Sequence, residues 1–207
     1  MNLTLLSSIT LAAVIVIALC VWRHKLYYHF RAVEKGKLYR SGLLSPLALK
    51  LICRRHRIKT VVNLLEAQRR AAPYYRRQVA FCAANGIKFV SLPLTVPPSV
   101  PPPPPPKFPQ PSPAPSSRKS AGDDRADDGD GDQVRQFLDL CDHRANHPIL
   151  LHCKQGVLRT GILVAAYQRH YHNMDNRTIY DSMPRFGHDF ESERYRAFRE
   201  FILNDRD

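Results

Sequence analysis

Three short, almost continuously apolar runs constrain the fold of this chain more than any other sequence feature. They cover residues 60–65, 89–94 and 148–153, and a fourth β-rich run covers residues 38–41. Apolar runs of this length are typical of strands that are buried on both faces of a parallel sheet. Helical patterns fill the intervals between them. The sequence therefore predicts an α/β domain with a central, mostly parallel sheet flanked by helices.

The helical signals consist of caps, stops and apolar stripes. Ser45 and Pro46 form a cap and a first-turn proline, and Gly86 is a helix stop. Val134, Phe137, Leu138 and Cys141 form one apolar stripe at helical spacing. We expect helices at 47–57, at 73–85, around that stripe, at 160–173, around 177–183 and at 191–204.

The N-terminal segment has the composition of a membrane span. Residues 3–22 form a run of 20 residues without a charged side chain, which is enough to cross a hydrocarbon layer. Residues 23–107 then hold 17 Lys and Arg but only two acidic residues. Because the basic flank follows the span, the positive-inside rule places the rest of the chain in the cytoplasm. We expect a transmembrane anchor at 1–22 and a basic juxtamembrane segment at 23–32; a cleaved export signal is the alternative.

A proline-rich and acidic segment interrupts the α/β pattern. Residues 97–132 contain 12 of the 17 prolines, and six of them are consecutive at 101–106. Such a composition buries too little apolar surface to fold, and a proline run favours an extended conformation. The sequence therefore predicts one domain over 33–207 with a disordered insert at 97–132. Docking of the insert to a proline-binding domain is the alternative.

Charge and cysteine content restrict the class of partner. The formal net charge of +13 favours anionic partners, but no nucleic-acid-binding module accompanies it. The five cysteines are an odd number, and no two of them lie two residues apart. The sequence therefore predicts neither a disulfide framework nor a cysteine-rich zinc site, and no nucleic-acid partner.

The candidate chemistry lies in PILLHCKQGVLRTG, residues 148–161. A buried strand ends at Cys153, and Arg159 opens a helix six residues later. The backbone N–H groups of a short loop that leads into a helix form a concave anion site. The same field stabilises a thiolate, so we expect Cys153 to be nucleophilic near neutral pH. The planar guanidinium of Arg159 can hold two phosphoryl oxygens at once.

Three neighbouring residues are expected to support this loop. Gly156 allows backbone conformations that a Cβ atom would oppose. The hydroxyl of Thr160 can donate a hydrogen bond to the Cys153 sulfur. His152 either orients the loop through its ring nitrogens or is an ordinary core histidine.

The stretch HCKQGVLRTG resembles the signature loop of the cysteine-dependent protein tyrosine phosphatases of the dual-specificity type. GKLYRSGLLSP and IKTVVNLLEA resemble the opening strands of the atypical subgroup found in bacteria, fungi and plants. The resemblance covers about residues 33–94 and 133–190. It implies hydrolysis of phosphomonoesters through a phosphocysteine intermediate, without metal or cofactor. By motif match, the catalytic residues would be Cys153, Arg159 and Thr160, and the backbone phosphate cradle would be Lys154, Gln155, Gly156, Val157 and Leu158.

The chain departs from this family at the general acid. An Asp usually follows the strand that matches 89–94, but here the next acidic residue is Asp123. The candidates are Asp123, Asp124, Asp127, Asp128, Asp130 and Asp132. Asp130 or Asp132 is favoured, because each would lie just before the next helix; the alternative is that all six only solvate the insert. General acid assistance is worth ~10²–10⁴-fold, and it matters less for good leaving groups such as pyrophosphates.

The sequence thus predicts a membrane-anchored phosphatase that acts on phosphotyrosine or phosphoserine/threonine proteins. A phosphoinositide or inositol pyrophosphate phosphatase using the same loop is the first alternative. A catalytically weak, membrane-tethered protein that binds phosphate without turning it over is the second.

Overall fold

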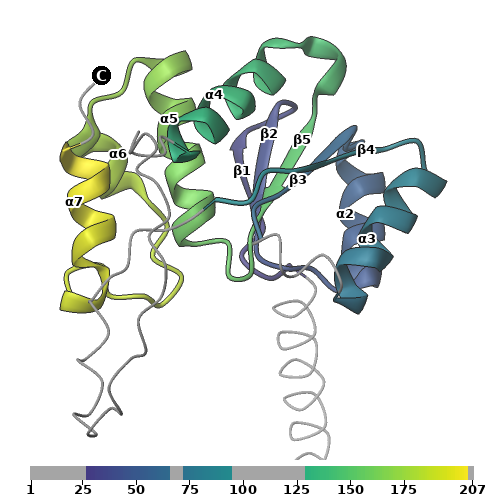
Figure 1. Cartoon of the computed structure of the whole chain (residues 1–207), viewed down its shortest axis with the longest axis horizontal. Helices are drawn as coiled ribbons and strands as arrows, with labels where there is room; N and C mark the ends of the chain where they lie inside the picture. The colour runs from purple at the N-terminus through teal and green to yellow at the C-terminus, as the bar shows by residue number, and fades with distance from the viewer. Residues whose placement is uncertain (1–26, 66–71, 95–128, 205–207) are drawn as a thin grey trace, which may run out of the picture.

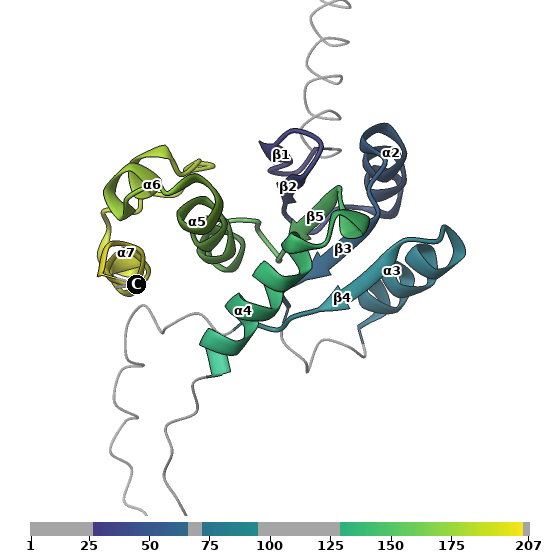
Figure 2. The same cartoon turned by 90° about the horizontal axis from the view of Figure 1, so that it is seen from above.

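The computed structural model describes residues 27–65, 72–94 and 129–204, which form a mixed five-stranded sheet with helices on both faces (Figures 1 and 2). The strand order is β1-β2-β5-β3-β4. The strands are β1 (Arg31–Glu34), β2 (Leu38–Ser41), β3 (Thr60–Asn63), β4 (Lys88–Ser91) and β5 (Ile149–His152). β1 runs antiparallel to β2, and the other three pairings are parallel. The predicted α/β architecture with a mostly parallel sheet is confirmed for these residues.

The helices divide between the two faces of the sheet. α2 (Pro46–His56) and α3 (Pro73–Ala84) cover one face. The other face carries α4 (Gly129–Asp142), α5 (Leu158–His172), α6 (Asn176–Ser182) and α7 (Arg196–Asn204). The expected cap of α2 is present, because Ser45 Oγ accepts a hydrogen bond from the N–H of Ala48 at 3.3 Å. The last predicted helix is shorter than expected, since a 3₁₀ turn (Glu193–Tyr195) precedes α7.

The alternation of side chains along β5 explains why its sequence is continuously apolar. Ile149 and Leu151 pack into the core under α4 to α7, and Leu150 packs into the core under α2 and α3. All three side chains are fully buried. A central strand with helices on both faces needs apolar residues at every position. The burial of β5 on both faces therefore fixes the position at which the following loop begins.

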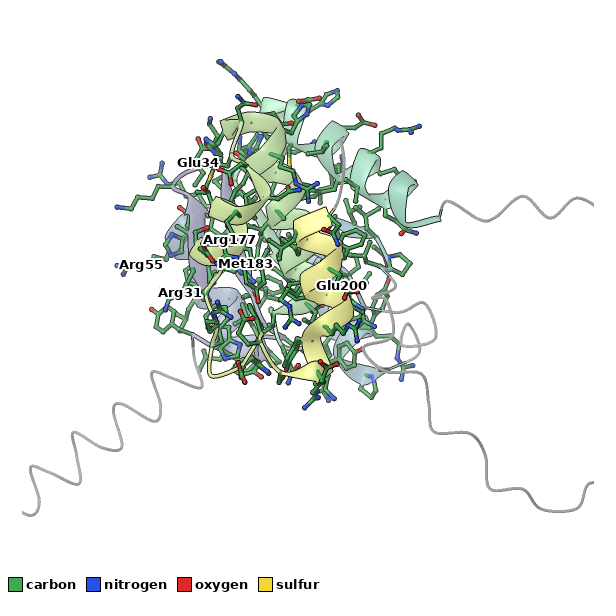
Figure 3. All side chains as sticks on the ribbon, turned by 90° about the vertical axis from the view of Figure 1, so that its left-hand side faces the viewer. Arg31, Glu34, Arg55, Arg177, Met183 and Glu200 are labelled. Carbon is green, nitrogen blue, oxygen red and sulfur yellow. The ribbon has the colours of Figure 1, made fainter. Side chains whose placement is uncertain are left out.

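The two edge strands differ from the sequence predictions. β1 was not predicted; it is a short and partly exposed strand, with Arg31 and Glu34 on one side of the molecule (Figure 3). The expectation that the run at 89–94 is a strand buried on both faces is wrong. β4 ends at Ser91, lies at the sheet edge and is only partly buried, because no strand covers its outer side.

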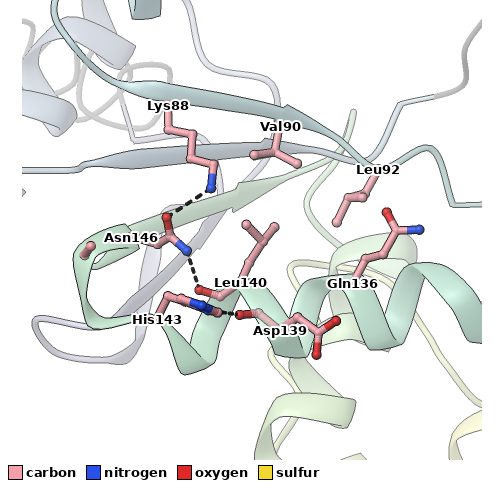
Figure 4. Close-up of a pocket in the computed structure, with 9 residues that line it drawn as sticks. Lys88, Val90, Leu92, Gln136, Asp139, Leu140, His143 and Asn146 are labelled. Atoms are coloured by element: carbon pink, nitrogen blue, oxygen red, sulfur yellow. Dashed lines mark hydrogen bonds between the residues drawn. The ribbon is translucent and has the colours of Figure 1, made fainter.

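One face of β4 borders a groove of about 460 Å³ (Figure 4). Lys88, Val90 and Leu92 line one wall, and the C-terminal half of α4 lines the other. Lys88 Nζ donates to Asn146 Oδ1 at 3.2 Å across the groove. The groove contains no residue of the loop after β5.

Two predicted segments lie largely outside the described residues. The predicted membrane span at 3–22 and residues 97–128 of the predicted insert are not described. Within residues 27–65, 72–94 and 129–204, no helix has the length and apolarity that crossing a bilayer requires. α4 begins at Gly129, so residues 129–132 are helical and the predicted insert boundary at 132 is wrong.

Candidate active site

The loop of residues 153–157 connects the end of β5 to the start of α5. β5 lies between β2 and β3, and His152 is in register with Ser41 and Asn63 of these strands. The three strands are parallel, so their carboxyl ends meet at one edge of the sheet. Binding sites of open α/β sheets occur at this edge.

The carbonyl groups of this loop are held by residues from the N-terminal part of the domain. Four consecutive carbonyl oxygens accept hydrogen bonds from three donor groups that precede α2. The contacts are Leu43 N to Lys154 O (2.9 Å), His29 Nδ1 to Gln155 O (2.6 Å), and Arg40 Nη2 to Gly156 O (2.6 Å) and Val157 O (3.5 Å). Since a carbonyl oxygen only accepts, His29 Nδ1 carries the proton in this contact.

The orientation of the carbonyls fixes the orientation of the backbone N–H groups. In a planar trans peptide the N–H points opposite to the preceding C=O. The N–H groups of residues 155–158 are therefore directed to the other, concave side of the loop. The Gly156 N–H does point there, because it donates to Cys153 Sγ at 3.1 Å. The result is a row of donors around the sulfur, at the N-terminus of α5, as an oxyanion requires.

Glycine is the only residue type that fits at position 156. Its φ is +72°, a conformation that residues with a side chain rarely adopt. A Cβ atom would lie 2.5 Å from the carbonyl carbon and oxygen of Ser41 and 2.6 Å from the nitrogen of Gly42. These are backbone atoms at the end of a central strand, so they cannot move aside. Glycine thus allows the loop to lie directly against β2.

Cys153 differs from the other described cysteines in its surroundings. Burial raises the pKa of Cys53 to about 12, that of Cys82 to about 11 and that of Cys141 to about 12. These three thiols are protonated at neutral pH and pack in the cores. Among the described cysteines, only Cys153 has a sulfur that accepts a hydrogen bond from a backbone N–H.

Arg159 lies in the first turn of α5, and its side chain is fixed from the chain that follows β4. Its Nε donates to the carbonyl oxygen of Leu94 at 2.7 Å. That contact orients the plane of the guanidinium. The structure therefore brings Cys153, the loop N–H groups and Arg159 to the same end of α5.

Thr160 does not make the predicted hydrogen bond. Its side chain is fully buried, and its Oγ1 has no hydrogen-bond partner in the described part of the chain. The donor to the Cys153 sulfur is instead the Gly156 N–H, at 3.1 Å. This detail of the sequence-based prediction is wrong.

His152 is a buried, neutral histidine. It is 1% exposed, and its Nδ1 lies 3.4 Å from the carbonyl oxygen of Cys153 while its Nε2 has no partner among the described residues. Burial lowers the pKa of His152 to about 4, although the backbone contact to Cys153 opposes this shift. The imidazole therefore carries no charge behind the loop at neutral pH.

This buried histidine should make the fold acid-sensitive. In the unfolded chain a histidine has a pKa of ~6.5, so the unfolded state binds a proton on acidification before the folded state does. The free energy of unfolding therefore falls as the pH decreases from about 6.5 toward 4, by roughly 3 kcal/mol from this group. Denaturant unfolding of wild type and His152→Gln at pH values across this range measures the effect. We expect a flatter pH dependence in the variant; equal slopes in the two proteins would show that His152 is not responsible.

The side chains of all six candidate general acids lie outside the described part of the structure. Asp130 and Asp132 lie in the first turn of α4 rather than in the loop before it, which corrects their predicted placement. Asp123, Asp124, Asp127 and Asp128 lie outside the described residues. The general acid therefore stays a prediction. In the described part of the chain, no group of three or more His, Cys, Asp or Glu side chains is placed to hold a metal ion.

Sequence reasoning missed the residues that hold the loop from behind. Arg40 is 3% exposed and donates to two loop carbonyls, and His29 donates to a third. His29 itself is stacked between the rings of Tyr28 and Phe186, with centroid distances of 4.3 and 4.2 Å. No local signal in the sequence pointed to either residue, because the two contacts join residues that are 126 and 116 positions apart.

Comparisons with known proteins agree with this arrangement. Residues 129–202 match a family described as DSP-PTPase phosphatase fused to NAD+ kinase. No curated protein sequence matches the chain. Its fold is similar to that of the core catalytic domain of the PP-IP phosphatase Siw14 from S. cerevisiae, crystallised with citrate (TM-score 0.55, 21% identity, 84% of this chain and 83% of that chain).

Two bacterial structures resemble the fold of this chain to about the same extent. One is a cysteine-to-serine variant of TpbA from P. aeruginosa in complex with phosphotyrosine (TM-score 0.55, 20% identity, 86% of this chain and 84% of that chain). The other is a putative phosphatase from Neisseria meningitidis (TM-score 0.53, 20% identity, 84% of this chain and 96% of that chain). The fold, the family match over residues 129–202 and the loop with Cys153 and Arg159 agree with one another, and together they resemble the cysteine-dependent protein tyrosine phosphatases of the atypical dual-specificity type.

Proposed function

We propose that this chain is a cysteine-based phosphatase, which hydrolyses phosphomonoesters on proteins, phosphotyrosine or phosphoserine/threonine, through a phosphocysteine intermediate. The observation that carries the proposal is the hydrogen bonding of the four loop carbonyls to groups outside the loop. That arrangement turns the N–H groups toward Cys153 before any substrate binds. Donors that are already oriented need no reorganisation when charge develops on a phosphoryl group.

The proposed reaction has two steps. The Cys153 sulfur attacks phosphorus, an S–P bond forms and the O–P bond to the leaving group breaks. The leaving oxygen takes a proton from a general acid, for which Asp130 and Asp132 are the candidates. Water then attacks the phosphocysteine and gives a proton to the acid that was deprotonated in the first step; the S–P bond breaks, phosphate is released and the thiolate is regenerated. In both steps Arg159 and the N–H groups of residues 155–158 would hold the phosphoryl oxygens.

A second candidate substrate class is supported by the surroundings of the loop. Inositol pyrophosphates and phosphoinositides are highly anionic, and exposed Lys154 adds a positive charge to the loop. A pyrophosphate leaving group also depends less on a general acid, and no acidic residue lies between Leu94 and Asp123. One of the similar structures, Siw14, is described as a PP-IP phosphatase.

We also propose that residues 3–22 anchor the chain in a membrane with the domain in the cytoplasm. The residues that follow this segment contact the site directly: Tyr28 O accepts from Gly42 N at 3.0 Å, and His29 donates to Gln155 O. An anchor at 3–22 would therefore keep the loop close to the membrane surface. A proline-binding domain that docks on residues 97–115 remains a proposed partner.

A substrate panel tests the proposed function. The full chain in detergent is assayed with a phosphotyrosine peptide, a phosphothreonine peptide, a phosphoinositide and an inositol pyrophosphate, and the Cys153→Ser variant provides the background rate. We expect hydrolysis of a phosphopeptide well above background. A kcat/KM more than tenfold higher for an inositol phosphate substrate would select the second candidate. Phosphate binding without hydrolysis of any substrate would contradict both proposed substrate classes. It would support the alternative of a membrane-tethered protein that binds phosphate without turning it over.

A further inference from the structure

Two arginines lie directly opposite each other in the β1–β2 hairpin. Arg31 and Arg40 are cross-strand partners, an arrangement that like charges normally destabilise. Both guanidiniums lie over the ring of Phe186, at 5.4 and 5.6 Å from its centroid. Burial, and in addition the charge of Arg31, lower the pKa of Arg40 to about 10, while Cys153 opposes the shift. The pair thus concentrates positive charge in one place.

No carboxylate among the described residues neutralises this pair. Glu34, on the same strand as Arg31, pairs with Lys37 at 2.6 Å and accepts from Tyr167 at 2.7 Å. Arg40 Nη2 donates to the loop, but its buried Nε has no partner in the described part of the chain. A buried charged group with an unused donor is costly unless an anion accompanies it.

The two guanidiniums line a cavity of about 220 Å³. This volume is several times the ~30 Å³ that one water occupies in the liquid. The walls come from β1, β2, α5 and the end of α6, and Gln168 of α5 adds an amide group. Figure 3 shows Arg31 and Met183, which belong to this lining, on the same side of the molecule. Of the two arginines in its lining, Arg40 is buried and Arg31 is exposed.

We propose that this cavity is a second phosphate site, which binds inorganic phosphate between Arg31 and Arg40. Guanidinium groups bind phosphate oxygens with paired hydrogen bonds, and two of them match the charge of a phosphate dianion. The site lies on the carbonyl side of the phosphate loop, whereas the proposed catalytic phosphate lies on the N–H side. The ligand would supply the missing acceptor for Arg40 Nε.

The position of Arg40 connects the two sites. The same side chain lines the cavity and donates to Gly156 O, so an anion that moves or fixes its guanidinium also acts on the loop. Two ligands that share one residue change each other's affinity by the same factor. The coupling between the two sites rests on the proposed function, since inorganic phosphate would be the reaction product. Binding of phosphate in the cavity does not depend on that function.

Equilibrium dialysis with radiolabelled inorganic phosphate tests the second site. At low ionic strength we expect the full wild-type chain to bind two equivalents of phosphate. Arg31→Gln should still bind phosphate at the loop after β5 and should lose the phosphate in the cavity. Arg159→Ala should lose the phosphate at the loop and still bind the one in the cavity. Arg55→Gln removes the same charge from the exposed surface of α2 and should retain both equivalents. Because Arg31 is exposed and faces a like charge, its replacement should not lower the thermal unfolding midpoint measured without phosphate.

The outcomes separate the two sites. Retention of both equivalents by Arg31→Gln would overturn the proposal, and so would a single wild-type equivalent that Arg159→Ala removes. An equal loss in Arg31→Gln and Arg55→Gln would also overturn it, since it would indicate nonspecific attraction by net charge. If Arg31→Gln loses an equivalent while Arg159→Ala loses none, the second site stands and the loop assignment fails.

Discussion

We expect replacement of Cys153 by serine to abolish phosphate ester hydrolysis by the full chain and to retain phosphate binding by the loop. A serine hydroxyl is not ionised near neutral pH, so the attacking anion is lost. The N–H cradle stays in place, because the loop carbonyls are held by His29, Arg40 and Leu43 and not by the sulfur. We expect a decrease in kcat of at least about 10⁴-fold. Steady-state rates and phosphate dissociation constants for the two proteins measure both parts of the expectation.

Cys53 provides a matched control. It is a buried thiol in the core between the sheet and α2, and burial raises its pKa to about 12. Cys53→Ala removes a thiol of similar burial, so it should lower stability somewhat and leave kcat nearly unchanged. Substantial hydrolysis by Cys153→Ser, or an equal loss in Cys53→Ala, would mean that Cys153 is not the nucleophile.

We expect replacement of Arg159 by lysine to keep the positive charge but to remove most of the activity. An ammonium group is a point charge that cannot present two parallel donors to two phosphoryl oxygens. Lysine also has no group equivalent to the Nε that donates to Leu94 O at 2.7 Å, so the side chain would lose its fixed orientation. Loss of one donor to a transition-state oxyanion costs about 10²–10³-fold in rate. We expect a decrease in kcat of this size.

The pattern of the kinetic constants distinguishes a transition-state contact from simple charge attraction. If Arg159 binds the phosphoryl group more tightly in the transition state, kcat and kcat/KM fall together. If it only attracts anionic substrate, KM rises and kcat stays the same. Arg55→Lys, a conservative change on the exposed surface of α2, controls for the substitution itself. Nearly normal kcat in Arg159→Lys would rule out the clamp role.

The strand, loop and helix that form the candidate site could be predicted from sequence because their determinants are local. The apolar run of β5, Gly156 in the loop and Arg159 at the helix start lie within a dozen residues of one another. Each of these three features predicts the backbone conformation of the segment in which it lies. The expected strand at 38–41 coincides with β2, and the helix ends agree within a few residues.

The support of the loop could not be predicted because it depends on contacts far apart in the sequence. His29 and Gln155 are separated by 126 residues, and Arg40 and Gly156 by 116. Nothing local shows that Arg40 turns toward the loop, since a single arginine in a strand predicts an edge or a surface position. The same limit explains β4: its composition is that of a buried strand, and only the strand order places it at the edge.

The central claim is that the sulfur of Cys153 takes the phosphoryl group from the substrate, and trapping measures this most directly. The full chain is mixed with a ³²P-labelled substrate from the panel, quenched during turnover, and digested for peptide mapping. The account predicts label on the peptide that contains Cys153, and none in Cys153→Ser treated in the same way. Turnover without label on that peptide, or label on another residue, would contradict it.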